Sequence, residues 1–407
     1  MATSLSTTTA TSAAQAPPTL SFPPQTFAKL SPHPYLLAHL RPSTSSQPSV
    51  RPNGRSPSDF RTPTAHTSSL SHASGSAVVR VGDTACVCGV RGEVLPVGHI
   101  PEWSADSATT VAVGGDLDPA DDDGDDENEG EGEDITGESS KKYDADDDED
   151  LLGSLALLVP NIELSTGCSP SHLPGSAPTA LAQTLSARLL SLLRSTHLIR
   201  PSSLRIAYQP PSNTTDPASS APKKVTKGFW TLYIDVLVIS ADGNLFDAIW
   251  ASVLLALHDT LLPAATYDAD REMIICSPSP DLALRLPLTG LPVASTFAVF
   301  ESGDRYRGGR GGLGNGNGLT AAGKTKGEKN AWILADPDAF EEGLCKESVT
   351  VVVDCSGSSS TAESKILRIE KSGGGVVGPE EMRQAVKMAE GRWAQWKGVL
   401  ANVGSSR

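Results

Sequence analysis

Several signatures that would place a chain in a common class are missing from these 407 residues. No apolar run reaches the length of about 18 residues that a membrane-spanning helix needs, so we expect no membrane partner. Residues 1–24 carry neither the charged nor the apolar part of a secretory signal. The six cysteines are scattered over a long chain. These absences predict reduced thiols in a nuclear or cytosolic protein.

Signatures of metal centres and hydrolases are also absent. Cys86 and Cys88 form the one close cysteine pair, and no second Cys/His cluster completes four zinc ligands. The eight histidines form no H-E-x-x-H motif, and no G-x-S-x-G motif occurs. We therefore expect no metal and no other cofactor.

Two carboxylates nevertheless stand near each other in the pattern. Asp235 lies inside a strand rich in β-branched and aromatic residues, and Asp242 follows where that strand ends. A pair of carboxylates there can hold a divalent metal or serve as a general acid. Alternatively, Asp242 makes the turn and Asp235 faces solvent, which is the interpretation that the residues alone favour.

Acidic residues are concentrated in one segment. The formal net charge is −15, but residues 116–150 contain 19 Asp and Glu against two Lys and carry −17 by themselves. The rest of the chain has a net charge of +2, so composition does not argue against RNA as a partner.

Segments without apolar periodicity are predicted to be loops or disordered. They are a tail at 1–25, an acidic insert at 101–150, a Gly/Arg-rich loop at 302–330, and shorter stretches at 41–50, 210–228 and 356–364.

Between these segments the hydrophobic patterns predict an α+β fold, because strand pairs alternate with single helices without a regular βαβ repeat. The helix expected at 179–194 has an apolar stripe at Leu181, Leu185, Leu189 and Leu192. The helix expected at 245–258 is apolar nearly all round. The expected helices are 27–40, 179–194, 245–258 and 379–400, and the expected strands are 77–81, 85–90, 151–159, 229–239, 273–276, 295–300, 332–334, 348–354 and 366–369.

Two motifs lie in the 302–330 loop. Residues 318–325 (GLTAAGKT) match a P-loop, followed by a hydrophobic strand that ends in Asp354, but no regular structure is predicted on either side of the match. A P-loop nucleoside triphosphatase is therefore an alternative function, but the flanking sequence does not favour it. Residues 306–312 (YRGGRGG) form a double Arg-Gly-Gly tract, whose arginines either contact RNA or belong to a solvated loop.

The order of several further motifs resembles the RNase PH family. The segment at 22–36 is similar, within that family, to the ring subunits of the eukaryotic RNA exosome. The segments that carry the resemblance are RPNGR at 51–55, FR at 60–61, GSAVVRVGDT at 75–84, CGVRGE at 88–93, VPNIE at 159–163, the 179–194 helix, ADG at 241–243 and PVASTF at 292–297.

This resemblance implies a fold of the ribosomal-protein-S5 domain-2 type. Its first part would comprise 26–100 and 151–300, and its second part 331–400 with a C-terminal helix. The implied partners are other RNase PH-like subunits in a hexameric ring, S1/KH cap subunits, a separate catalytic nuclease, and the single-stranded RNA threaded to it. The implied function is support of 3′–5′ processing of ribosomal RNA and turnover of messenger RNA, in the nucleus, nucleolus and cytoplasm.

Departures from the family pattern indicate a subunit without catalysis. Active members hold inorganic phosphate with a helix motif similar to G-R-S-L-R, whereas residues 187–191 are ARLLS and keep only Arg188. Asp242 matches the catalytic acid, but the residues after it, 244–246, turn apolar. Asn53 replaces the acid of R-P-D-G-R. Arg188 and Asp242 are therefore interpreted as degenerate remnants, with an active phosphorolytic 3′–5′ exoribonuclease as the alternative.

RNA contacts are predicted at arginines of the matched motifs and of the Arg-Gly-Gly tract. These are Arg51, Arg55, Arg61, Arg307 and Arg310.

Overall fold

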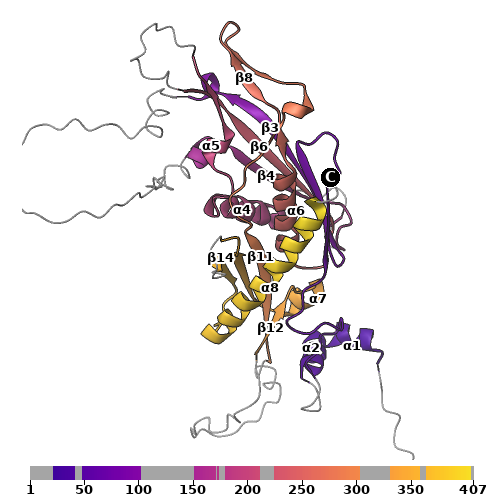
Figure 1. The fold of residues 1–407 in the computed structure, drawn as a ribbon. Coiled ribbons are helices and arrows are strands. Elements are labelled where there is room, and N and C mark those ends of the chain that lie inside the picture. Colours follow the sequence, from indigo (N-terminus) through magenta and orange to yellow (C-terminus); the bar gives the residue numbers. More distant parts are fainter. Residues whose placement is uncertain are drawn as a thin grey trace, which may run out of the picture. The chain divides into compact units, whose positions relative to one another are not determined.

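Figure 1 shows a computed structural model that describes residues 22–41, 48–101, 151–170, 172–173, 179–210, 224–302, 331–357 and 364–404. The chain divides into two units, residues 1–57 and 58–407. In the first unit, α1 (Pro24–Leu30) and α2 (Pro32–Leu40) follow each other directly. Pro32 starts α2, and Pro34 lies in its first turn, where a proline costs no helical hydrogen bond.

The second unit contains a six-stranded sheet in the order β1-β2-β3-β6-β4, with β5 paired to β6. The strands expected at 77–81 and 85–90 are confirmed as β2 and β3, which pair as a hairpin with Gly82 at φ +62° in its turn. The long strand β6 is antiparallel to β3 and parallel to β4. The bounds are β1 (Pro63–Thr67), β2 (Gly75–Val81), β3 (Thr84–Pro96), β4 (Leu158–Leu164), β5 (Arg205–Tyr208) and β6 (Val225–Ser240).

Helix α6 (Leu245–Asp259) lies at the centre of this unit, as its apolar pattern predicted. Twelve of its fifteen residues are buried, and it packs on β2 and β3 of the first sheet and on β11 (Val293–Glu301) of the second. The buried apolar residues of both sheets join α6 in one continuous core.

The second sheet has the order β12-β11-β13-β14 and is antiparallel throughout. Its other strands are β12 (Ala331–Ala335), β13 (Glu347–Asp354) and β14 (Lys365–Ser372). The C-terminal helix α8 (Pro379–Gly404) packs against β11 and β13. Because β11 belongs to this sheet, the second half of the fold begins at Val293, inside the range 151–300 expected for the first part.

Shorter elements complete the unit. They are α5 (Pro201–Leu204), α7 (Ala339–Leu344), the pair β7 (Leu261–Leu262) and β10 (Leu284–Arg285), the hairpin β8 (Ala265–Asp268) and β9 (Met273–Cys276), and 3-10 turns at Val97–His99 and Pro280–Leu282.

Three local predictions were wrong. Residues 151–154 are helical and β4 begins only at Leu158, because Ala156 at φ +47° turns the chain between the two. In α4 (Ala180–Ser195), Leu185, Leu189 and Leu192 are buried as predicted, but Leu181 is 45% exposed and Ala182 is buried in its place. The predicted loop 210–228 ends early, since β6 already begins at Val225.

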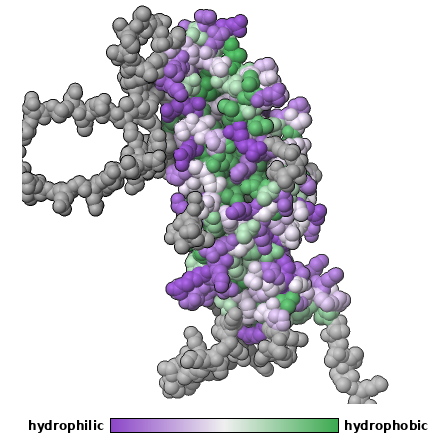
Figure 2. All heavy atoms as spheres, viewed as in Figure 1, coloured by the Kyte–Doolittle hydropathy of each residue, from purple (hydrophilic) through white to green (hydrophobic). Residues whose placement is uncertain are grey.

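Among the described segments, no helix is long and apolar enough to cross a bilayer. Figure 2 shows hydrophilic and hydrophobic residues mixed over the face turned to the viewer.

Candidate functional site

The candidate site is built around the turn between β6 and α6, which contains the A-D-G motif. Gly243 has φ +72°, and a Cβ on it would lie 2.4 Å from the carbonyl carbon of Asp338, so only glycine fits. The hydroxyl of Thr84 accepts a hydrogen bond from the Asp242 N–H (3.1 Å) and donates one to the Gly243 carbonyl (3.0 Å). The turn is therefore fastened both to the β2–β3 hairpin and to the segment before α7.

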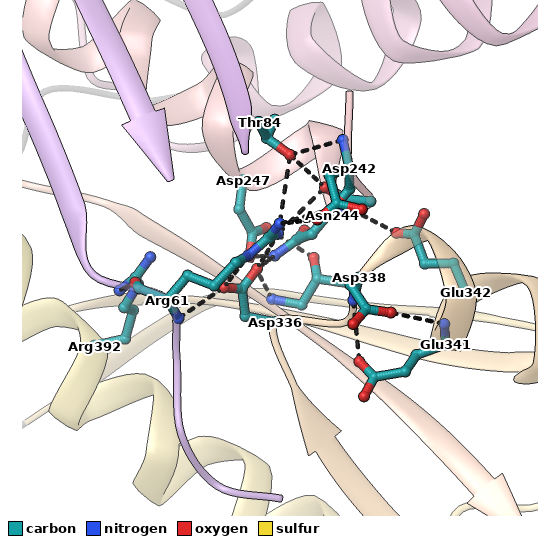
Figure 3. A network of polar contacts seen from close by, with 12 residues as sticks. Arg61, Thr84, Asp242, Asn244, Asp247, Asp336, Asp338, Glu341, Glu342 and Arg392 are labelled. Carbon is teal, nitrogen blue, oxygen red and sulfur yellow. Dashed lines mark hydrogen bonds and ion pairs between the residues drawn. The ribbon is translucent and has the colours of Figure 1, made fainter. Parts of the chain in front are cut away.

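A buried ion pair between Arg61 and Asp336 lies against this turn (Figure 3). The Arg61 Nη2 is 2.7 Å from Asp336 Oδ1, its Nε is 2.9 Å from Oδ2, and the two side chains are 9% and 1% exposed. The Arg61 Nη1 also donates to the Asp242 carbonyl at 2.7 Å. Burial alone would raise the pKa of Asp336, but the hydrogen bonds and charge of Arg61 outweigh it and lower that pKa to about 2.

Asn244 connects this ion pair to a second buried carboxylate. Its Nδ2 donates to Asp336 Oδ1 at 2.7 Å and to Asp247 Oδ2 at 2.8 Å. Asp247 also accepts hydrogen bonds from the Thr296 N–H and hydroxyl, each at 2.7 Å. Burial nevertheless raises the pKa of Asp247, and the nearby charge of Asp336 raises it further. The network thus joins the strand–turn–helix of the first half to β11 and β12 of the second.

Asp242, the residue that matches the family's catalytic acid, lies at the edge of this network. Its side chain is 41% exposed, and its Oδ2 is 3.7 Å from Arg61 Nη1. Asp242 thus keeps access to solvent, whereas Asp336 does not.

Arg188, the other predicted remnant, is engaged by groups of the chain itself. It lies on α4, and its Nη2 and Nε are 2.7 and 3.0 Å from the Glu370 Oε2 on β14. Its Cζ is 4.0 Å from the centre of the Phe246 ring, within the range of a cation–π contact. A carboxylate at its edge and an aromatic ring at its face therefore already contact this guanidinium, and Glu370 is shared with Arg368, whose Nη2 is 2.5 Å from Oε1.

A cavity of about 350 Å³ lies beside Arg188. Arg188, Asn244, Phe246 and Lys346 contribute to its wall, and Asp242 is not among its lining residues. Phosphorolysis requires the acid and the bound phosphate to meet at one reacting atom. Asp242 therefore lies outside the cavity that Arg188 lines.

The five arginines predicted to contact RNA lie in different parts of the chain. Arg61 was expected to contact RNA, but its guanidinium is buried in the network above and is assigned to the fold. Arg51 and Arg55 belong to the first unit, where the Arg51 N–H donates to the Arg55 carbonyl at 2.8 Å. The Asn53 side chain accepts from the Arg55 N–H at 3.0 Å, so it closes the turn in place of the family's acid. Arg307 and Arg310 lie outside the described residues.

Asp235 does not pair with Asp242. It is exposed on β6, where Asn161 Nδ2 donates to it at 3.3 Å, as the solvent-facing alternative predicted. The described part of the chain contains no group of three or more His, Cys, Asp or Glu placed to hold a metal. The P-loop match at 318–325 lies outside the described residues, and Asp354 ends β13.

Two members of the buried network were not found from the sequence. Asp247 stands three residues after Asn244, the spacing at which side chains meet in a first helical turn, and this signal was available. Asp336 follows a short strand, and nothing local pairs it with an arginine 275 positions earlier.

Comparisons with known proteins agree with this architecture. Models of the 3′ exoribonuclease family match the chain, domain 1 over residues 134–263 and domain 2 over 318–392, together just over half of its length. The exosome complex component rrp43 of Schizosaccharomyces pombe is 26% identical over 377 residues, which cover 92% of this chain and 97% of that protein. The exosome complex component Rrp42 of Methanothermobacter thermautotrophicus is 27% identical over 160 residues, which cover 39% of this chain and 44% of that protein.

The fold is similar to that of a solved structure as well. A chain from the Archaeoglobus fulgidus exosome with RNA bound to the active site superposes with a TM-score of 0.52 at 18% identity, over 90% of this chain and 96% of that chain.

Two sheets around a buried central helix, with a family match in each half, define an RNase PH-type protein. The chain belongs to the 3′ exoribonuclease (RNase PH) family. The predicted α+β fold and the resemblance to this family are confirmed. Within the family, the motif at 22–36 is similar to ribosomal RNA-processing protein 43, in agreement with the long match to rrp43 of Schizosaccharomyces pombe.

Proposed function

We propose that this protein is a ring subunit of an RNA exosome, which supports 3′–5′ RNA processing and degradation without a phosphorolytic centre of its own. The ring assignment is supported by similarity to an exosome component along 92% of the chain. The proposal that the protein is not catalytic rests on one observation: Arg188 forms an ion pair with Glu370 and a cation–π contact with Phe246.

A phosphate ion would have to displace these contacts to use Arg188. The carboxylate of Glu370, 2.7 Å from Nη2, would repel the incoming anion, and the Phe246 ring covers one face of the guanidinium. Asp242 stands where active members have the catalytic acid, but no phosphate nucleophile would be positioned for the reaction. Loss of phosphate binding is therefore sufficient to stop phosphorolysis even with Asp242 in place.

In this proposal the partners are other RNase PH-like subunits in a hexameric ring, S1/KH cap subunits and a separate nuclease, and single-stranded RNA passes through the ring. Arg55, Arg307 and Arg310 are the proposed RNA contacts; Arg51 is left out because, like Arg61, it is buried, with 1% of its surface exposed. The proposed location is the nucleus, nucleolus and cytoplasm, which imaging of a fluorescent fusion would test. Pull-down from native extract should recover the ring partners, and recovery of the chain as a monomer would contradict the ring assignment.

The proposed absence of phosphorolytic activity is tested in a reconstituted ring from which the separate nuclease is omitted. With oligo(A) and inorganic phosphate, we expect no release of nucleoside diphosphate, and Asp242→Asn should change nothing. A phosphorolytically active family member serves as the positive control. Diphosphate release that Asp242→Asn abolishes would overturn the proposal and establish an active exoribonuclease.

A further inference from the structure

A groove of about 570 Å³ lies on the first sheet, and the β6 residues that line it, 235–237, precede the Asp242 turn by five to seven positions. Alternation along β6 places Ile234, Val236 and Val238 in the core, with side chains at most 2% exposed. The alternate positions Asp235 and Leu237 face the groove instead. The groove is therefore the outer face of a sheet whose inner face packs on α6.

Apolar side chains are unusually exposed on this outer face. β6 is an interior strand between β3 and β4, and its solvent side would ordinarily be polar. Leu237 is instead 40% exposed, and its neighbour in register on β3 is Val87, which also lines the groove. Leu70, 43% exposed, forms part of the wall. A contiguous apolar surface of this kind marks an interaction site.

The wall of the groove is held in place by buried hydrogen bonds. The Ser68 hydroxyl and N–H donate to the carboxylate of Asp259 at 2.8 and 3.1 Å, and the Ser76 N–H donates to it at 3.0 Å. The Leu70 N–H donates to the Ser76 hydroxyl at 3.0 Å. Gly89 leaves room beneath, since a Cβ there would lie 3.2 Å from Leu70 Cδ1. The groove is therefore preformed, and a ligand would not have to order its wall.

The charge of the groove is negative. Arg91 is neutralised by Glu93, with its Nε 3.2 Å from Oε1, and its Cζ lies 5.5 Å from the centre of the Tyr233 ring. Within the residues that the structure places, Asp235 accepts only from the neutral Asn161 amide, and Glu163 has no ion pair. Glu163 lies opposite Leu237 on the parallel strand β4, diagonal to Asp235, and the spacing of strands and the rise per residue put such positions about 8 Å apart. One cation can reach both carboxylates.

We propose that this groove binds a protein segment in which an apolar side chain stands next to Lys or Arg. The apolar side chain would cover Leu237, Val87 and Leu70, and the cation would lie between Asp235 and Glu163. The two carboxylates would repel the phosphates of RNA, so the complementary partner is a basic, apolar peptide. This inference does not depend on the proposed function, because an active phosphorolytic enzyme would present the same groove.

The test uses the full chain in cells, with a benzophenone amino acid in place of Leu237. After irradiation of the native complex, mass spectrometry of the adduct identifies the attached peptide. We expect a peptide with Lys or Arg within a few residues of the adduct. The paired substitutions Asp235→Asn and Glu163→Gln remove the charge but keep the shape, and should reduce the adduct yield about tenfold, as the loss of paired interfacial charges predicts.

Asp83→Asn is the matched control, because Asp83 is exposed in the turn between β2 and β3 and lies outside the groove, and the adduct yield should be unchanged. An adduct to RNA, an adduct to a peptide without a basic residue, no adduct, or a yield indifferent to Asp235→Asn and Glu163→Gln would each overturn the proposal. None of these outcomes depends on nucleoside diphosphate release.

Discussion

Replacing Asp336 by Asn tests whether the ion pair with Arg61 stabilises the fold. The pKa of Asp336 is about 2 in the folded protein against an ordinary value of 3.8, and a difference of about two units corresponds to about 2–3 kcal/mol. Leaving the buried Arg61 without its partner typically costs about 3–5 kcal/mol. We therefore expect Asp336→Asn to lower the free energy of unfolding by about 2–5 kcal/mol at neutral pH. Asn suits the test because it tolerates the φ of +49° at this position.

The pH dependence of this effect has a defined sign. A carboxyl whose pKa is lowered by folding stabilises the protein above its unfolded pKa, and the stabilisation is lost as the pH falls through the folded pKa. The difference between the wild type and Asp336→Asn should therefore be constant above about pH 5 and narrow between about pH 4 and pH 2.

Urea titrations followed by tryptophan fluorescence measure both effects, since five of the six tryptophans are buried in the folded protein. Asp83→Asn, an exposed partner of Arg80, is the control and should change the free energy of unfolding by less than about 1 kcal/mol. The reasoning is refuted if Asp336→Asn behaves like this control at pH 7, or if its difference from the wild type does not narrow in acid.

Three further substitutions test packing and turn geometry. Leu254→Ala removes a side chain that is 5% exposed in α6 and should cost about 2–5 kcal/mol in urea titrations; a cost below about 1 kcal/mol would contradict the packing described. Gly243→Ala must adopt φ +72° against Asp338, so its thermal midpoint should fall further than that of Leu254→Ala. Asp338→Ala breaks the capping box with Glu341 and should cost about 1 kcal/mol, and an unchanged midpoint would argue against the cap.

Much of the fold could be predicted because its strongest elements have long, consistent patterns. α6 is apolar nearly all round and β6 is rich in β-branched and aromatic residues, so the sequence required both to be buried. The strands expected at 77–81 and 85–90 leave only a short turn between them, and the structure pairs them as the β2–β3 hairpin, with Gly82 at a φ of +62° that suits glycine. The order of the motifs was sufficient to identify the RNase PH family.

Short elements were decided by their surroundings. The leucine-rich run at 151–159 suits a strand or a helix, and the structure uses it as a helical turn followed by β4. The first turn of α4 also depends on its neighbours, since Ala182 is buried there in place of Leu181, whereas the rest of the predicted stripe is buried as expected. The capping box of α7 was present in the sequence at Asp338 and Glu341, but the helix is too short for its periodicity to show.

The candidate site shows the same division. The sequence by itself determined that Asp242 stands in a turn and that Arg188 lacks the usual phosphate-binding neighbours. Only the tertiary structure decided that Arg61 is buried against Asp336 and that Glu370 and Phe246 hold Arg188. Hydrophobic periodicity records which side chains avoid water, but the partner of a buried charge depends on which distant segments meet. That meeting is established only when the two sheets pack around α6.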